Sequence, residues 1–150
     1  AKGYWFARNT QLPSTSELLP IDVDAFRNLI DENEELYLRE RLPGGEFRRV
    51  QRERMLAAVE YVRAAYANAG ILVRIAEAAR ESADPKTAEA AGKLFDNAVQ
   101  LRWYAVQVIP QLYFKMLFPG TSRAPRNLFD RYDILTHQAL VLGRLGSVER

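Results

Sequence analysis

The sequence contains no cysteine and only one histidine. Without cysteine there is no disulfide framework, no thiolate metal ligand and no cysteine nucleophile, and a reducing compartment such as the cytoplasm fits that composition. The single imidazole is His137, with Asp133 four residues earlier on the same predicted helix face. A zinc site generally needs more nitrogen or sulfur ligands than one histidine supplies. The sequence therefore predicts no metal site and no cofactor.

Long hydrophobic runs are also missing. The longest charge-free apolar stretch, residues 103–114, is interrupted by Pro110 and falls short of the ~20 residues that cross a bilayer. Residues 4–6 (Tyr-Trp-Phe) followed by Arg8 have the composition of an interfacial aromatic belt with a cytoplasmic positive charge. One interpretation is a membrane anchor ahead of Ala1, which would tether the domain at the cytoplasmic face. Removal of an initiator methionine is the simpler interpretation.

Catalytic patterns are absent as well. No serine lies in a nucleophile-elbow motif. Gly44 and Gly45 form the only glycine pair, and no strand or phosphate-binding pattern surrounds them. The acidic run at residues 31–35 fits the first turn of a helix, where negative charge favours the helix dipole. The sequence thus predicts no catalytic residue and a protein that is not an enzyme.

What the sequence does contain is helical periodicity. Hydrophobic residues make up 48% and charged residues 27%, which is typical of a globular protein. Residues 1–20, with their prolines and serines, are predicted to form an extended linker, and residues 21–150 a single all-α domain. Apolar spacing and helix-stop residues predict four helical regions. The first covers residues 22–42, with a possible break into two short helices at Asp31. The others cover residues 46–82, 85–118 and 125–143.

The two longest helices carry matching seams of small and apolar residues. Their members recur at alternating steps of four and three, except for a final step of four in the second helix, and this is the heptad pattern through which helices pack on one another. In the first helix the seam is Ala58, Val62, Ala65, Ala69, Leu72, Ala76 and Ala79. In the second it is Leu94, Ala98, Leu101, Ala105, Val108, Leu112 and Met116. The short turn at Asp84 and Pro85 makes the pair a long antiparallel hairpin.

The shorter flanking helices are predicted to join the hairpin at the end away from Asp84. They would form a four-helix bundle there and cover the apolar outer side of the second long helix at Trp103, Phe114 and Phe118, since a helix that is apolar all round must be covered all round. The alanine-rich half near the turn would then project as a two-helix arm. Because such an arm is poorly buried alone, it is expected to pair with a second copy, giving a homodimer.

Three arginines form a line on the first long helix. Arg52, Arg63 and Arg74 are eleven residues apart, so they share one face, opposite the seam. Glutamates on or beside that line favour an ordinary solvated surface. The alternative is a surface that binds nucleic acid or anionic lipid. The net charge of only +2 argues against nucleic acid.

Arg102 stands out because its neighbours on the helix surface are apolar. A buried guanidinium must be paired or it costs several kcal/mol. We expect a salt bridge to a carboxylate on a neighbouring helix. The alternative is an anion-binding pocket, which a small-anion binder or a helical enzyme would use.

These patterns do not identify a function. They favour a non-enzymatic helical interaction or scaffold domain that dimerises and holds an unknown protein partner. The candidate contact residues for an anion or a partner are Arg102, Arg52, Arg63 and Arg74.

Overall fold

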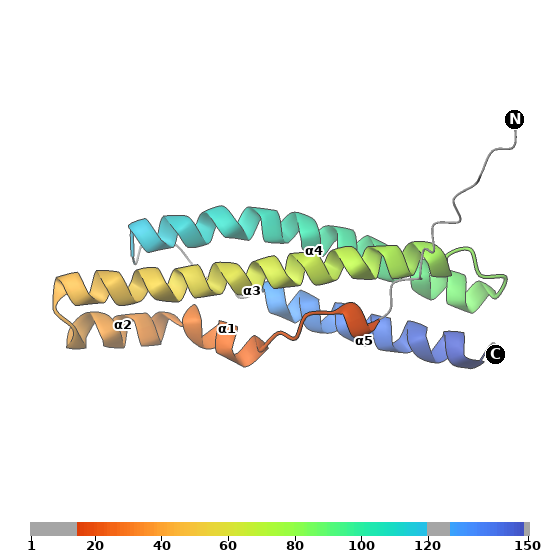
Figure 1. Cartoon of the computed structure of the whole chain (residues 1–150), viewed down its shortest axis with the longest axis horizontal. Helices are drawn as coiled ribbons and strands as arrows, with labels where there is room; N and C mark the ends of the chain where they lie inside the picture. The colour runs from red at the N-terminus through yellow and green to blue at the C-terminus, as the bar shows by residue number, and fades with distance from the viewer. Residues whose placement is uncertain (1–14, 120–126, 149–150) are drawn as a thin grey trace, which may run out of the picture.

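The fold is all-α. A computed structural model describes residues 15–119 and 127–148, and within these ranges it contains helices and short connections but no strand. The elements in chain order are the 3-10 turn η1 (Thr15–Glu17), α1 (Val23–Leu29), α2 (Glu32–Arg41), α3 (Gly44–Ala79), α4 (Pro85–Leu117) and α5 (Asn127–Val148). Figure 1 shows α3 and α4 as two long helices lying side by side, with shorter helices along them. The predicted antiparallel hairpin with flanking helices is confirmed.

Aspartates begin three of the helices. The side chain of Asp22 accepts a hydrogen bond from the backbone at the start of α1, Asp31 does the same for α2, and Asp84 for α4. Each such cap satisfies a backbone N–H that the helix itself leaves free and contributes ~1 kcal/mol. Asp31 therefore divides the first helical region in two, as its sequence suggests. Pro85 follows Asp84 at the first helical position, where its missing N–H costs nothing.

The seam between α3 and α4 is the core of the molecule. Its small side chains are fully buried, including Ala65, Ala69 and Ala76 on α3 and Ala91 and Ala98 on α4. Side chains of this size allow close approach of two helix backbones, so the hairpin packs along its length without large cavities to fill. The seam is therefore buried between α3 and α4, as predicted. The alanine-rich half is not a bare two-helix arm, however, because α5 lies along it (Figure 1).

The last seam position belongs to Lys115 and not to Met116. Lys115 lies three residues after Leu112 and continues the alternation of steps, and it is only 2% exposed, whereas Met116 is half-buried. The seam predicted from the sequence ends instead at Met116, four residues after Leu112. A buried lysine is rare unless it is paired. Its partner, Glu35 of α2, comes from a distant part of the chain.

The flanking helices divide the hairpin between them. Helices α1 and α2 lie along the open half (residues 44–64 and 105–117), whereas α5 runs along the turn half (residues 65–104) towards the α3–α4 turn (Figure 1). A hydrogen bond from Asn97 Nδ2 to Gln138 Oε1, 2.8 Å long, fixes α5 beside the start of α4. The expectation that both flanking helices join the open end is therefore wrong for α5. The chain between Leu117 and Asn127 can span about 30 Å when extended, so its length allows this return.

Four helices come together where the two flanking layers meet. Phe26 of α1 packs on Phe129 of α5 with ring centroids 4.3 Å apart and on Tyr61 of α3 at 6.3 Å. Arg131 of α5 lies over the ring of Tyr104 on α4, 5.0 Å from its centroid. Aromatic pairs of this kind add about 1 kcal/mol each to the area they bury. The predicted four-helix packing is found at this level of the hairpin.

The segment before α1 is anchored by Asn68 of α3. Asn68 accepts a hydrogen bond from the backbone N–H of Leu19 and donates one to the Leu19 carbonyl, and it donates another to Tyr132 Oη, all 2.8 Å long. A completely buried amide must be satisfied in this way, because each lost partner costs ~1–3 kcal/mol. Residues 15–20, the last part of the predicted linker, therefore contact the helical body. Its remainder, with residues 4–6 and Arg8, lies outside the described ranges.

Candidate interaction surface

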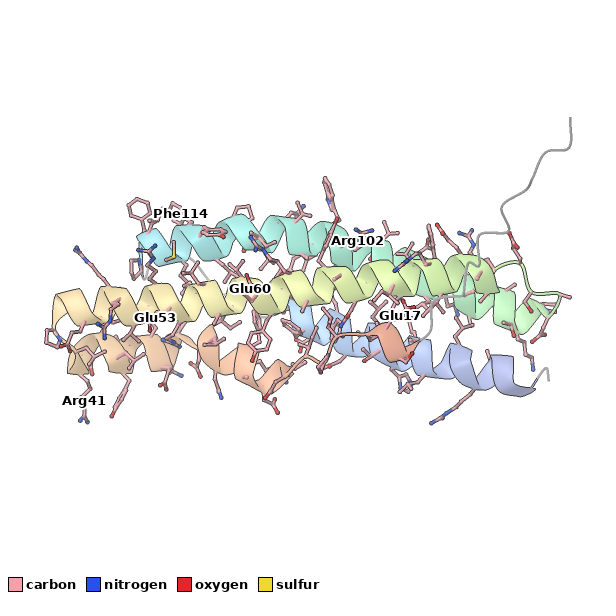
Figure 2. All side chains as sticks on the ribbon, in the orientation of Figure 1. Glu17, Arg41, Glu53, Glu60, Arg102 and Phe114 are labelled. Atoms are coloured by element: carbon pink, nitrogen blue, oxygen red, sulfur yellow. The ribbon has the colours of Figure 1, made fainter. Side chains whose placement is uncertain are left out.

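Helix α4 is apolar on two opposite sides, and one of them is covered by nothing in the described structure. The uncovered side follows steps of four, three, four, four and three residues, which keeps it on one stripe of a helix with 3.6 residues per turn. We call this stripe the outer face. It consists of Val99, Trp103, Val106, Pro110, Phe114 and Leu117, all of them exposed. Figure 2 shows Phe114 projecting away from α3.

The size of the outer face sets it apart from scattered surface hydrophobics. Trp103 is 68% exposed, Leu117 67% and Phe114 49%. Phe118 continues the surface past the helix end, 5.0 Å from Phe114 between ring centroids. Since an aromatic side chain presents roughly 150–250 Å², the whole face exposes about 600 Å². Contiguous apolar patches of this size on a monomer are commonly functional.

The sequence predicts that the flanking helices cover this surface, and that prediction is wrong. Helix α5 approaches α4 from the side of Asn97 and Tyr104, and α2 approaches it from the side of Lys115. All three positions lie on the flank of α4 near the seam, away from Trp103. Helices α1 and α2 pack on α3, and α5 packs on α4 from that flank, so the outer face is left uncovered.

Arg102 lies next to the outer face but is engaged with α3. Its guanidinium carbon is 4.2 Å from the centroid of the Tyr66 ring, a cation–π contact. No carboxylate pairs with it among residues 15–119 and 127–148, so the predicted salt bridge is not formed there. Gly70, one turn after Tyr66, leaves the space that the guanidinium fills. Arg102 Nε is buried without a hydrogen-bond partner.

The other three predicted contact residues all lie on α3. Arg52, Arg63 and Arg74 are all exposed, as their spacing predicts. Arg63 pairs with Glu60 at 3.3 Å, an exposed ion pair of the kind that contributes little. Arg52 lines a surface hollow together with Leu117 and Phe118 at the end of the outer face. The structure therefore brings only Arg52 to the apolar surface.

A buried charge cluster lies between α2, α3 and α4, and sequence reasoning missed it. Lys115 Nζ is 3.1 Å from Glu35 Oε2, with both side chains less than a tenth exposed, and Arg39 lies 3.9 Å from the other Glu35 oxygen. Lys115 Nζ has no acceptor in hydrogen-bonding geometry, so the contact is an ion pair held by proximity. The only signal in the sequence was the seam itself, whose three-residue step from Leu112 ends on Lys115.

Two more polar groups are buried close by on α3. Gln51 is completely buried and both ends of its amide lack a hydrogen-bond partner. Arg54 donates through Nη2 to the Asn28 carbonyl at the end of α1, at 2.9 Å, where a positive charge also favours the helix dipole. Burial lowers the pKa of Arg54, and the carboxylates of Glu34 and Glu35 oppose that shift. Arg54 therefore ties α3 to the end of α1 and lies near the acidic residues of α2.

In residues 15–119 and 127–148, no group of three histidine, cysteine, aspartate or glutamate side chains is arranged so that it could hold a metal ion. His137 is exposed, and Asp133 instead contacts Arg27 at 3.6 Å. A hollow between α1 and α5 is lined by Arg27 and Asp130, but these two already pair at 3.0 Å.

No described helix is both long and apolar enough to cross a membrane. Comparison of the chain with known proteins returns no matching family model, no similar curated protein and no similar solved structure. The outer face of α4 is therefore the candidate functional surface.

Proposed function

We propose that this chain is a non-enzymatic helical interaction domain that binds another protein through the outer face of α4. The observation that carries the proposal is the exposure of Trp103, Phe114 and Leu117 on one side of a helix whose opposite side is the core. Exposing this surface to water costs roughly 25 cal/mol per Å². A partner that covers it recovers that free energy, and aromatic side chains are the residues that dominate such interfaces.

The charged alternatives have weaker support. An anion site or an enzyme built on Arg102 requires a free guanidinium, yet this one is engaged with the Tyr66 ring, 4.2 Å from its centroid. A nucleic-acid or anionic-lipid surface built on α3 requires unpaired cations in a row, and the middle one, Arg63, is paired with Glu60. The outer face has no such internal partner.

The proposal includes a location. The absence of cysteine fits the cytoplasm, where thiols stay reduced and disulfides do not stabilise folds. An anchor ahead of Ala1 would hold the domain at the cytoplasmic side of a membrane and concentrate it in two dimensions, which strengthens a modest protein contact.

Site-specific photo-crosslinking in cells that produce the full-length protein tests the proposal. A photoreactive phenylalanine analogue replaces Phe114 in one variant and Ile134 in a second. Ile134 is the matched control, because it is an apolar residue of α5 that is 57% exposed and lies off the outer face. We expect a discrete protein adduct from position 114 that mass spectrometry identifies, and none from position 134. The added substitution Trp103→Glu should remove the adduct.

Three results would contradict the proposal. They are no adduct from position 114, adducts with lipid alone, or the same protein adducts from positions 114 and 134.

A further inference from the structure

From Trp103 to Leu117, the spacing of the outer face is the same when read in either direction along α4. From Trp103 the steps are three, four, four and three residues, through Val106, Pro110 and Phe114 to Leu117. A second α4 packed antiparallel and centred on Pro110 therefore meets each apolar residue with an apolar residue. Trp103 faces Leu117 of the other copy, Val106 faces Phe114, and Pro110 faces its own equivalent on the twofold axis.

We infer that the partner of the outer face is a second copy of this chain, packed antiparallel in this register; the inference rests on the proposed function. A twofold axis produces an isologous interface, in which one patch must complement itself. The outer face does so in size as well as spacing, because the large Trp103 and Phe114 each lie opposite a smaller aliphatic side chain. Alternation of large and small residues is what lets facing helices interdigitate.

Charge also favours a copy over a different partner. Between Trp103 and Leu117 the only charged residue is Lys115, and its side chain is 2% exposed and paired with Glu35. The exposed polar residues beside the stripe, Gln107 and Gln111, are neutral. Between these two positions, two such stripes therefore bring no exposed charge of α4 against each other. Arg52 of α3 lies outside this stretch, at the hollow beside Leu117 and Phe118.

The area agrees with a dimer. About 600 Å² from each copy gives at most about 1,200 Å² in total, which is at the lower limit for specific protein–protein interfaces. Since the interface lies wholly on α4, it leaves α5, α1 and α2 free on the other side of the hairpin (Figure 1). It differs from the dimer expected from sequence, in which the two-helix arms near the α3–α4 turn pair with each other; α5 lies along that half of the hairpin (Figure 1).

Cysteine cross-linking of the purified full chain tests the register directly, because the protein has no cysteine of its own. A disulfide needs Cα atoms roughly 4.4–6.8 Å apart, so it forms only between positions that face each other. Under mild oxidation Pro110→Cys should give a disulfide-linked dimer. Trp103→Cys and Leu117→Cys should link poorly alone but efficiently when the two variants are mixed. Ile134→Cys on α5 is the control that should stay monomeric.

Sedimentation equilibrium supplies a second readout that does not depend on oxidation. Val106→Glu places a carboxylate opposite Phe114 of the other copy, and we expect it to raise the dimer dissociation constant at least ~10-fold, the change that corresponds to 1.4 kcal/mol. Val99→Glu is the matched control. Its counterpart in the proposed register, position 121, lies beyond the end of α4, so the effect should be much smaller. Circular dichroism verifies that each variant is folded.

Each remaining outcome would overturn the inference in a distinguishable way. Self-links at both 103 and 117 would show a parallel packing. A wild-type chain that stays monomeric at high concentration, together with a photo-adduct from position 114 to a different protein, would refute the second copy and leave the interaction function standing. A monomer that floats with phosphatidylglycerol vesicles, and no longer does so after Val106→Glu, would refute both.

Discussion

Gly70, in the middle of α3, lies beside the guanidinium of Arg102. A Cβ atom placed there would be 3.5 Å from the Arg102 guanidinium carbon, which is ordinary van der Waals contact. The glycine is therefore not required by space for a methyl group, although a larger side chain would displace Arg102 from Tyr66. Glycine inside a helix costs ~1 kcal/mol relative to alanine.

Gly70→Ala should accordingly raise the free energy of unfolding by about 0.5–1 kcal/mol. Urea unfolding followed by circular dichroism measures this at a fixed protein concentration. Gly92→Ala, at a helix position of α4 with no atom within 4 Å of its Cβ, is the control and should give a similar gain. Gly70→Leu should instead lower stability, and a gain in that variant would contradict the contact with Arg102.

Removing either member of the Lys115–Glu35 ion pair should destabilise the protein, and removing Glu35 should destabilise it more. Removing one member of a buried pair leaves an uncompensated charge, at ~3–5 kcal/mol. Glu35→Leu leaves Lys115 without its counter-charge, whereas Lys115→Met leaves Glu35 with Arg39 still 3.9 Å away. Glu35→Leu should therefore destabilise the protein more in urea unfolding. The double variant should recover most of the loss.

If the double variant were as unstable as the sum of the two single variants, the charges would be acting independently. The pair would then contribute no coupling energy.

At the scale of elements, Asn68 acts as the fastener between three segments. Its one amide side chain holds the backbone of Leu19 and the hydroxyl of Tyr132. Loss of that side chain frees residues 15–20 and α5 at once, although neither contains the mutation.

Asn68→Ala should lower the free energy of unfolding by about 2–3 kcal/mol, since it leaves buried polar groups unsatisfied. It should also abolish hydrogen-exchange protection of the Leu19 amide, measured by mass spectrometry or NMR. Asn97→Ala is the matched control, because its single bond to Gln138 is only partly buried. Its cost should stay under ~1 kcal/mol. Continued protection of Leu19 in the Asn68 variant would disprove the fastening role.

Local patterns were sufficient to predict the helices. Three aspartate caps, the turn at Pro85 and the two seams predict α1 to α4 to within a few residues. The last helix is longer than predicted, ending at Val148 instead of near Gly143. Glycine inside a helix costs only ~1 kcal/mol relative to alanine, so Gly143 does not by itself end the helix.

The buried polar sites could not be predicted in the same way. From the sequence, Glu35 looks like one of several acidic residues at the start of a helix, and no local pattern marks Asn68. Each is buried because of a partner dozens of residues away in the chain. The path of α5 is equally non-local. The apolar stripe of α5 does not indicate which half of the hairpin this helix covers. Its position on the hairpin determines whether the outer face is buried. The candidate surface therefore followed from tertiary placement and not from any motif.

For the molecule as a whole, Tyr132 links stability to alkaline pH. Burial raises the pKa of Tyr132 above its ordinary value of 10.0, and this outweighs the hydrogen bond from Asn68. The unfolded chain then loses the phenolic proton at lower pH than the folded chain does. The corresponding stability is complete below about pH 10 and is lost as pH rises through the folded-state pKa.

Tyr132→Phe should therefore show a shallower decline in the free energy of unfolding above about pH 10 than the wild type. Urea titrations across that range measure the two slopes, and the other tyrosines are common to both proteins and cancel. Near neutral pH the variant should be less stable, since Asn68 loses an acceptor. Equal slopes at alkaline pH would show that Tyr132 is accessible to solvent in the folded chain.

The meeting of Phe26 and Phe129 has a consequence for how the molecule comes apart. These rings, with Arg27 bridging to Asp130, are the principal described contact between the layer made by α1 and α2 and the layer made by α5. Each layer otherwise rests on its own stretch of the hairpin, so detaching one costs the other little. Partial opening should then occur as two separate cooperative events above a persistent α3–α4 unit, each with its own exchange rate, before global unfolding.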